Sequence, residues 1–358
     1  MKIITRYISK EFLKIFAMTF FAFVMLYILV DFFEKIDDFI EAKATEYVWI
    51  YFIYKVPFIS VQMAPMGVLM STIITLGILA KNHEIIAMKA NGISLFRIGS
   101  PLIGISLIIT IMSFMTSEFI VPYTNRKVNT IWRHDVKKKP HELIYKSEQL
   151  WYKGENTIYN IRSFNSRTQT LEGVIVNQFD HDFRLIRRIQ AHSGTWQKDH
   201  WSFHNGIVKE IDTDGSYKIT PFEERTFNLI ETPDDFQRDV TYSDEMGVVE
   251  LHEYAKKIIN EGYAAYRYLV DMHIKLSFPF ICVIMSLIGI PLALRKEKGV
   301  GIGTGIGISL GIILLYLITF EIARTLGYSD VVPPIVAAWF ANILFGAIGF
   351  FLLLSTKQ

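Results

Sequence analysis

Residues 56–80 read VPFISVQMAPMGVLMSTIITLGILA and contain no charged side chain. An α-helix needs about 20 mostly apolar residues to cross a bilayer, so this stretch predicts a membrane span. Further runs of the same character occur along the chain. The predicted spans are residues 12–33, 56–80, 98–121, 274–294, 299–322 and 334–354. The sequence therefore predicts a polytopic α-helical membrane protein with six transmembrane helices.

The composition supports this class. Hydrophobic residues make up 51% of the 358 positions and charged residues only 20%, whereas soluble domains carry charge at about a quarter of positions. The net charge of +2 gives no reason to expect a nucleic-acid partner. The first apolar run is too long for the core of a signal peptide, so we expect a retained helix. The single cysteine, Cys282, lies in an apolar run, so we expect the middle of the chain to fold without disulfides.

The distribution of charge predicts the orientation, because cytoplasmic loops carry an excess of lysine and arginine. Basic residues cluster at the N-terminus, after the second span and after the fourth: Lys2, Arg6, Lys10, Lys81, Lys89, Arg97, Arg295, Lys296 and Lys298, with Lys357 at the C-terminus. Acidic residues follow the first and fifth spans: Asp31, Glu34, Asp37, Asp38, Glu41, Glu46 and Asp330. We therefore expect both termini in the cytoplasm and residues 122–272 in the periplasm.

Residues 122–272 contain short alternating segments that are typical of half-buried strands. The predicted strands are 157–162, 173–179, 183–191, 196–204, 207–211 and 217–222, and the predicted turns are 153–156, 180–182, 204–206 and 212–215. Closely spaced short strands predict an antiparallel sandwich or a jelly roll. A helix at 249–261 and a segment at 263–272 then lead back to the membrane.

Three domains follow. Residues 1–121 form spans 1–3 with a cytoplasmic segment at about 81–92, residues 122–272 form the periplasmic β-rich domain with its connecting helix, and residues 273–358 form spans 4–6.

No pattern of catalytic residues is present in the sequence. The nine histidines are scattered along the chain, and the serines lie in no nucleophile elbow. The glycine-rich stretch that begins at Gly299 lacks the Lys-Ser/Thr and the preceding strand of a phosphate-binding loop. We predict no enzyme activity, no cofactor and no metal in this chain. For ATP-driven work, ATP and Mg would be bound by another subunit.

Glycines recur every four residues at Gly299, Gly303, Gly307 and Gly311, which places them on one face of the fifth predicted helix. Small residues at this spacing let another backbone approach closely in lipid. One interpretation is static helix packing. The other is a loosely held seam that opens as a gate, formed by Gly303, Gly307 and Gly311.

The segment KNHEIIAMKANG at 81–92 predicts a short helix that ends at Gly92. Ile85 and Met88 form its apolar edge. It is either a solvated turn or a coupling helix that enters the groove of an ATPase. In the second case the ATPase-coupling residues are His83, Glu84, Ile85, Met88 and Gly92. Glu84 would then contact a basic or polar group of the ATPase.

Ionisable residues lie at the predicted outer rim of the membrane. Asp31, Glu34 and Lys35 end the first span, Lys55 begins the second, and Arg324 ends the fifth. Such residues commonly anchor a helix at the interface. Alternatively, they bind substrate, with the basic side chains meeting lipid phosphates.

These features together resemble a known family, the lipopolysaccharide export permeases of the YjgP/YjgQ (LptF/LptG) type. The order of three spans, a β-rich domain and three spans is similar, and the most specific local match is residues 83–94, HEIIAMKANGIS. Further matches are RYISKE at 6–11, DFFEKIDDF at 31–39, Pro65-Met66, LGILA at 76–80 and Val332-Pro333-Pro334. Residues 251–254, LHEY, resemble the G-type permease more than the F-type.

The resemblance implies an ATP-driven transporter. Its partners would be a cytoplasmic ABC ATPase dimer, a paralogous LptF-type permease and a periplasmic bridge protein of LptC/LptA type. Lipopolysaccharide would enter a cavity sideways from the outer leaflet of the inner membrane and leave along the jelly-roll domains. The chain departs from family members that carry basic residues at the positions of Asp31, Asp37 and Asp38. Lys35 or Lys55 could take over their contacts with phosphate.

Two other functions stay open. The chain could be an ABC-type permease for another amphiphile, such as a lipoprotein, or a membrane assembly factor without transport. The predicted coupling helix argues against the last. For the permease we expect two further features. The β domain should present an apolar inner face, including Ile158, Ile161, Val174 and Val176, to acyl chains. The fifth helix should form its gate with the partner's aromatic-rich first helix, which in this chain carries Phe16, Phe20, Phe21 and Phe23.

Overall fold

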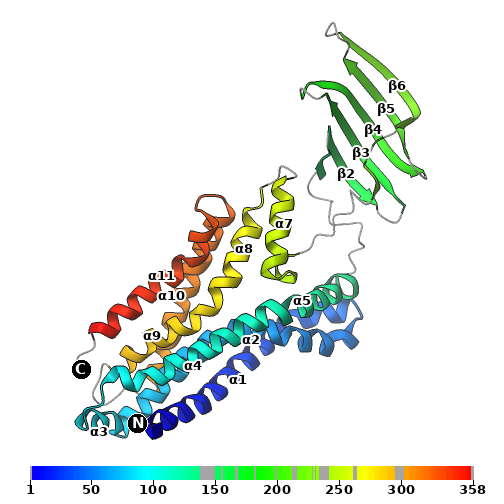
Figure 1. The fold of residues 1–358 in the computed structure, drawn as a ribbon. Helices are drawn as coiled ribbons and strands as arrows, with labels where there is room; N and C mark the ends of the chain where they lie inside the picture. Colours follow the sequence, from blue (N-terminus) through cyan, green and yellow to red (C-terminus); the bar gives the residue numbers. More distant parts are fainter. Residues whose placement is uncertain are drawn as a thin grey trace. The chain divides into compact units, whose positions relative to one another are not determined.

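A computed structural model describes residues 2–137, 150–154, 156–165, 168–180, 183–197, 200–211, 216–227, 229, 231–233, 242–260, 264–294 and 302–355. The chain divides into two compact units (Figure 1). The helical unit comprises Met1–Val136, Tyr242–Lys257 and Ala264–Gln358. The β unit comprises Lys137–Thr241 and Ile258–Tyr263.

Six helices of the described chain are long and apolar enough to cross a membrane, which confirms the six predicted spans. The first two are α1 (Lys2–Glu41) and α2 (Val48–Lys81), joined by η1 (Thr45–Tyr47). The third is α4 (Leu95–Met115), which continues through η2 (Thr116–Ile120), α5 (Val121–Thr130) and η3 (Ile131–Val136). The fourth comprises α8 (Tyr266–Ser277), η6 (Phe278–Phe280) and α9 (Ile281–Leu294). The last two are α10 (Ile302–Tyr328) and α11 (Pro334–Ser355).

Several of these helices run well beyond the apolar runs that predicted them. At 1.5 Å per residue, the 40 residues of α1 span about 60 Å, roughly twice the hydrocarbon thickness of a bilayer. The ends of such a helix therefore project into the headgroup region or beyond. Figure 1 shows the beginning of α1 and the end of α11 at the same end of the helical unit as the short helix α3 (Glu84–Ala90).

Helix α2 forms the centre of the helical unit. Its most apolar window is 83% buried, whereas that of α1 is only 6% buried. Phe12 of α1 and Leu76 of α2 are fully buried in one core cluster with Cys282 of α9. Most of the surface of α1 is consequently left for lipid or for another chain.

The β unit contains one antiparallel sheet whose six described strands follow each other in chain order. The strands are β1 (Leu150–Lys153), β2 (Thr157–Asn165), β3 (Thr170–Phe179), β4 (Leu185–Gln197), β5 (His200–Ile211) and β6 (Tyr217–Phe227). A β domain between the third and fourth spans is thus confirmed. The described strands form a meander, and the jelly-roll topology stays a prediction.

One face of the sheet carries the core of this unit. Tyr159, Val176, Ile189 and Val208 lie opposite one another on four neighbouring strands and are almost completely buried. Ile161 and Val174 belong to the same cluster, as expected, but Ile158 does not. Successive side chains of a strand point to opposite faces, so Ile158 and Ile161, three positions apart, cannot share one. Tyr159 occupies the place that Ile158 was expected to fill.

Two strand boundaries also differ from expectation. Residues 204–206 were predicted as a turn, yet they lie inside β5, where Asn205 has a φ of 53°. The residues predicted as one strand at 196–204 instead belong to the end of β4 and the beginning of β5. Gly206 fits within β5 because Phe222 and the backbone of Gln190 approach it too closely for a side chain. The predicted turn at 212–215 lies outside the described residues.

Candidate functional site

A cavity of about 730 Å³ opens in the helical unit between α2, α8 and α10. Its wall is mainly apolar and comprises Phe58, Val61, Met63, Met66, Ile274, Phe278, Leu317 and Phe320. Its rim carries the polar and charged groups Ser243, Asp244, Arg267, Lys275, Glu321 and Arg324. The apolar wall could hold the acyl chains of an amphiphile, and the charged rim could hold its polar headgroup.

Positive charge predominates at this rim, with three cations against two carboxylates. Arg267 stacks over the ring of Tyr328, 5.6 Å from its centroid, and within the described chain it has no ion pair. Lys275 donates to the backbone carbonyl of Met246. Arg324 lies 3.4 Å from Glu321. These groups could hold an anionic headgroup, because hydrogen bonds between cations and phosphate are among the strong ones in proteins.

A second, smaller hollow of about 270 Å³ borders a buried ion cluster. Asp31 accepts hydrogen bonds from Lys35 at 2.8 Å and from Lys55 at 2.7 Å. The ammonium of Lys35 also lies 5.2 Å from the ring centroid of Trp132. Asp31 and Lys55 are 6% and 8% exposed. The structure thus brings three predicted substrate-binding residues together, whereas Glu34 lies exposed on α1.

The predicted gate glycines point away from the rest of the described chain. Gly303, Gly307 and Gly311 are exposed, and a Cβ on any of them would meet no atom within 4 Å beyond the neighbouring backbone of α10. Gly327 on the same helix is different, since a Cβ there would lie 2.5 Å from Cβ of Ala337. Close packing within this chain therefore requires Gly327 but not the glycine row. Gly299 lies outside the described residues.

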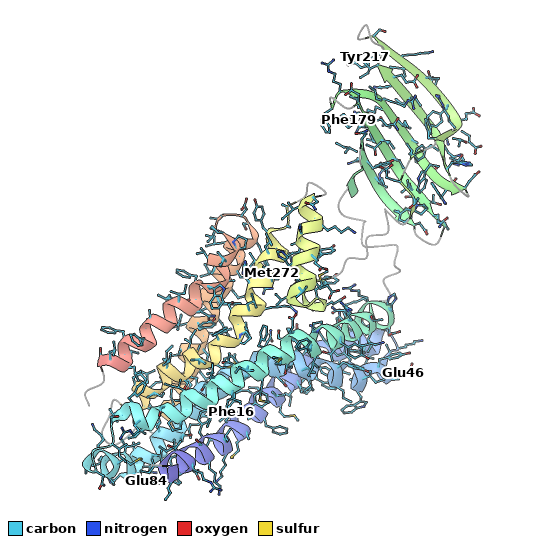
Figure 2. All side chains as sticks on the ribbon, in the orientation of Figure 1. Phe16, Glu46, Glu84, Phe179, Tyr217 and Met272 are labelled. Carbon is cyan, nitrogen blue, oxygen red and sulfur yellow. The ribbon has the colours of Figure 1, made fainter. Side chains whose placement is uncertain are left out.

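The predicted coupling segment forms α3, in which Figure 2 labels Glu84. His83 precedes it with a φ of 61° and Gly92 follows it with a φ of 76°. Ile85 is only 6% exposed and belongs to the core cluster of the helical unit, against which Met88 also packs. Ile86, by contrast, is 47% exposed. The expectation that Ile85 and Met88 fill a partner's groove does not fit this packing, and Ile86 is the apolar side chain at the surface.

The segment between the β unit and α8 was not predicted to carry functional residues. Its elements are η5 (Ser243–Glu245) and α7 (Val248–Asn260), where a helix was expected at 249–261. The guanidinium of Arg126 donates to both carboxylate oxygens of Glu250, at 2.7 and 2.8 Å. The N–H of Val248 donates to Glu118 at the start of α7, where an unpaired backbone donor needs an acceptor. Polar contacts thus attach this segment to α5 and to η2.

Asp271 on α8 is a buried ionisable residue near the cavity that was not predicted. It is 7% exposed and accepts hydrogen bonds from Ser243 and Tyr328. The sequence could have indicated Asp271, because an ionisable residue beside an apolar membrane span is a candidate functional residue.

The fold and the site define a multi-pass membrane permease with an inserted β domain. The sequence model of the lipopolysaccharide export system permease LptF/LptG matches residues 6–355, and the chain belongs to this family. Permease protein LptG of Escherichia coli strain K12 is 24% identical over 359 residues, which cover 98% of each chain. LptG of Haemophilus influenzae is 23% identical over 356 residues, which cover 95% of each chain. The predicted family is confirmed.

Proposed function

We propose that this chain is the permease subunit of an ABC transporter that takes lipopolysaccharide from the outer leaflet of the inner membrane and passes it to a periplasmic bridge. The observation that carries the proposal is the cavity with an apolar wall and a mainly cationic rim. Lipopolysaccharide combines several acyl chains with phosphates, so it matches both parts.

The two parts of the cavity contribute differently to binding. Acyl chains gain little by leaving a bilayer for an apolar wall, because lipid tails are as apolar as the side chains that replace them. The wall formed by Phe58, Phe278 and Phe320 therefore permits entry without driving it. Selectivity comes from the rim, where Arg267, Lys275 and Arg324 offer charge-assisted hydrogen bonds to phosphate. Lys35 and Lys55 form a second cationic site, partly neutralised by Asp31.

Entry of so bulky a lipid requires two helices to part. A seam of interlocked large side chains would leave voids when it opened, at a substantial packing cost. The row of Gly303, Gly307 and Gly311 avoids this cost, since it offers only a shallow surface that lipid can cover. Its exposure in the single chain supports a role in contact with another chain. The facing element is the first helix of a paralogous permease of LptF type.

Energy comes from ATP and Mg bound by a separate cytoplasmic ATPase dimer. The cytoplasmic side holds both termini and α3, whose Glu84 and Ile86 contact the ATPase. The β unit lies in the periplasm and passes acyl chains along the face that carries Ile161, Val174 and Val176 to a bridge protein of LptC/LptA type. The chain itself performs no catalysis in this scheme.

The test is a photo-crosslinking amino acid at Phe278, in the cavity wall, in the transporter purified from membranes with its partners. The matched control replaces Phe340, which is 48% exposed on α11 and does not line the cavity. Mass spectrometry should find lipopolysaccharide enriched at position 278 over position 340. A lipoprotein captured at position 278 would support a permease for another amphiphile. Equal capture of bulk phospholipid at both positions, with no co-purifying ATPase, would support an assembly factor.

A further inference from the structure

Asp271 joins three elements of the helical unit at one carboxylate. Ser243 of η5 donates to Oδ2 and Tyr328 of α10 donates to Oδ1. Nη2 of Arg324, also on α10, lies 3.5 Å from Oδ1. The Nε of Arg324 in turn donates to the hydroxyl of Tyr328 at 2.7 Å. These four residues, here called the Asp271 latch, connect the outer part of α10 to α8 and to η5.

Arg324 belongs to this latch and to the rim of the 730 Å³ cavity at the same time. Its side chain is 35% exposed, whereas that of Asp271 is 9% exposed. Its distances to the carboxylates of Asp271 and Glu321 are 3.5 and 3.4 Å. Both exceed the 2.7–2.9 Å that is typical of a strong charge-assisted hydrogen bond. Its terminal nitrogens are therefore held only loosely, and its side chain lines the cavity in which a ligand would lie.

We propose that a phosphate group in the cavity binds Arg324 in place of Asp271 and thereby releases α10 from α8 and η5. The inference rests on the proposed function, because it assigns a regulatory role to the headgroup of the transported lipid. Phosphate carries more charge than a carboxylate and accepts two parallel hydrogen bonds from a guanidinium. It therefore competes well for Arg324.

The exchange leaves no buried charge without a partner. Asp271 keeps the hydroxyl donor of Ser243 when Arg324 turns toward the ligand and Tyr328 moves away with α10, so the usual cost of stranding a buried carboxylate is reduced. The helix that is released is α10, which carries the exposed row of Gly303, Gly307 and Gly311. Binding of the headgroup would therefore loosen the helix that forms the gate.

The experiment measures the distance between α10 and α7 in the complete purified transporter. Spin labels go on cysteines at Leu326, which is 40% exposed, and at Val249, which is 67% exposed. The native Cys282 is fully buried and should not take up label. Lipopolysaccharide should shift the distance by about 2 Å or more, the scale of helix movements in switching proteins. The same lipid stripped of its phosphates should bind more weakly, and at concentrations where it does bind it should leave the distance unchanged.

Variants separate the latch from general effects of lipid binding. Asp271→Asn should populate the shifted distance without ligand. Arg324→Gln lacks one cation of the rim, so it should bind lipopolysaccharide more weakly, and the lipid that does bind should not change the distance. The control, Asp330→Asn, makes the same chemical change at a residue outside the cavity and the latch. It should respond as the unmodified protein does. If Asp271→Asn fails to assemble, Arg324→Gln alone still tests the latch.

Lipid binding is followed in the same samples by native mass spectrometry. Bound lipopolysaccharide with an unchanged distance, or an undiminished shift in Arg324→Gln, overturns the latch and leaves the proposed function intact. A sample that binds no lipopolysaccharide contradicts the proposed function and the latch together. A shift produced equally by inorganic phosphate supports the latch with free phosphate as its ligand.

Discussion

The Nζ atom of Lys55 lies 2.7 Å from Oδ2 of Asp31. The two residues come from α2 and α1, and Lys35 occupies the other carboxylate oxygen at 2.8 Å. One buried carboxylate thus holds two ammonium groups. The order of stability of variants at this cluster follows from that count of charges.

Asp31→Asn should destabilise the protein more than Lys55→Met. The asparagine leaves two neighbouring ammonium groups without a counter-charge, and breaking such a buried pair costs about 3–5 kcal/mol. The methionine leaves the Asp31–Lys35 pair intact and fills a similar volume, at a cost of about 1.5 kcal/mol or less. Thermal unfolding in detergent measures both. Glu34→Gln, at an exposed site, is the control and should change little. The opposite order for the two variants would show that Asp31 does not neutralise this cluster.

Substitutions of two glycines on α10 should separate folding from transport. Gly327→Ala should destabilise the chain by about 1–3 kcal/mol, because its Cβ would clash with Ala337 and Val270. A Cβ at Gly307 would meet no neighbour in the described chain and the position is exposed, so Gly307→Leu should leave the melting temperature unchanged and block export. Normal export by Gly307→Leu would show that no helix closes over this face.

The two isoleucines of α3 should have different effects. Ile85→Ala removes buried side-chain volume and should lower stability by about 2–4 kcal/mol. Ile86→Ser should leave the free energy of unfolding within about half a kcal/mol of that of the unmodified chain. It should nevertheless weaken co-purification of the ATPase. Glu84→Arg should keep the fold while ATP hydrolysis is uncoupled from transport. Unchanged ATPase binding by Ile86→Ser and unchanged transport by Glu84→Arg would remove α3 from the contact.

Photo-crosslinkers on β2 should report the face along which acyl chains move. A probe at Ile161 points to the buried apolar face and should capture lipid when ATP is supplied. A probe at Ile158, three residues earlier, points to the other face and should capture none. Capture at Ile161 without ATP would indicate passive binding instead of a relay, and equal capture at both positions would exclude this path.

The sequence predicts the membrane topology well because each span is a continuous apolar run, as residues 56–80 illustrate. The β region is also recognisable, since alternation survives in stretches such as 157–162. The face assigned to Ile158 is wrong because apolar residues occupy both faces of that strand, and apolarity alone cannot distinguish them. The sequence also fails to show that Ile85 is buried, for a related reason. A helix of 7 residues is too short for its periodicity to show which side is buried.

The Asp271 latch illustrates a different limit. Ser243 is 28 positions from Asp271 and Tyr328 is 57 positions away, with a separate helix carrying each group. Only the packing of α8 against α10 and η5 brings them together. The exposure of the glycine row likewise becomes visible only in the packed helical unit. In the sequence, the same four-residue spacing is equally compatible with glycines buried in a static helix contact.

The most direct test of lateral entry at α10 is a disulfide between a cysteine at Gly307 and one at mid-depth in the first helix of the partner permease. Formation of the bond should stop the export of lipopolysaccharide, while the assembled complex and its ATPase stay together. Reduction should restore export. Full export with the bond closed would contradict the account, because the lipid would then enter elsewhere and the glycines would serve packing alone.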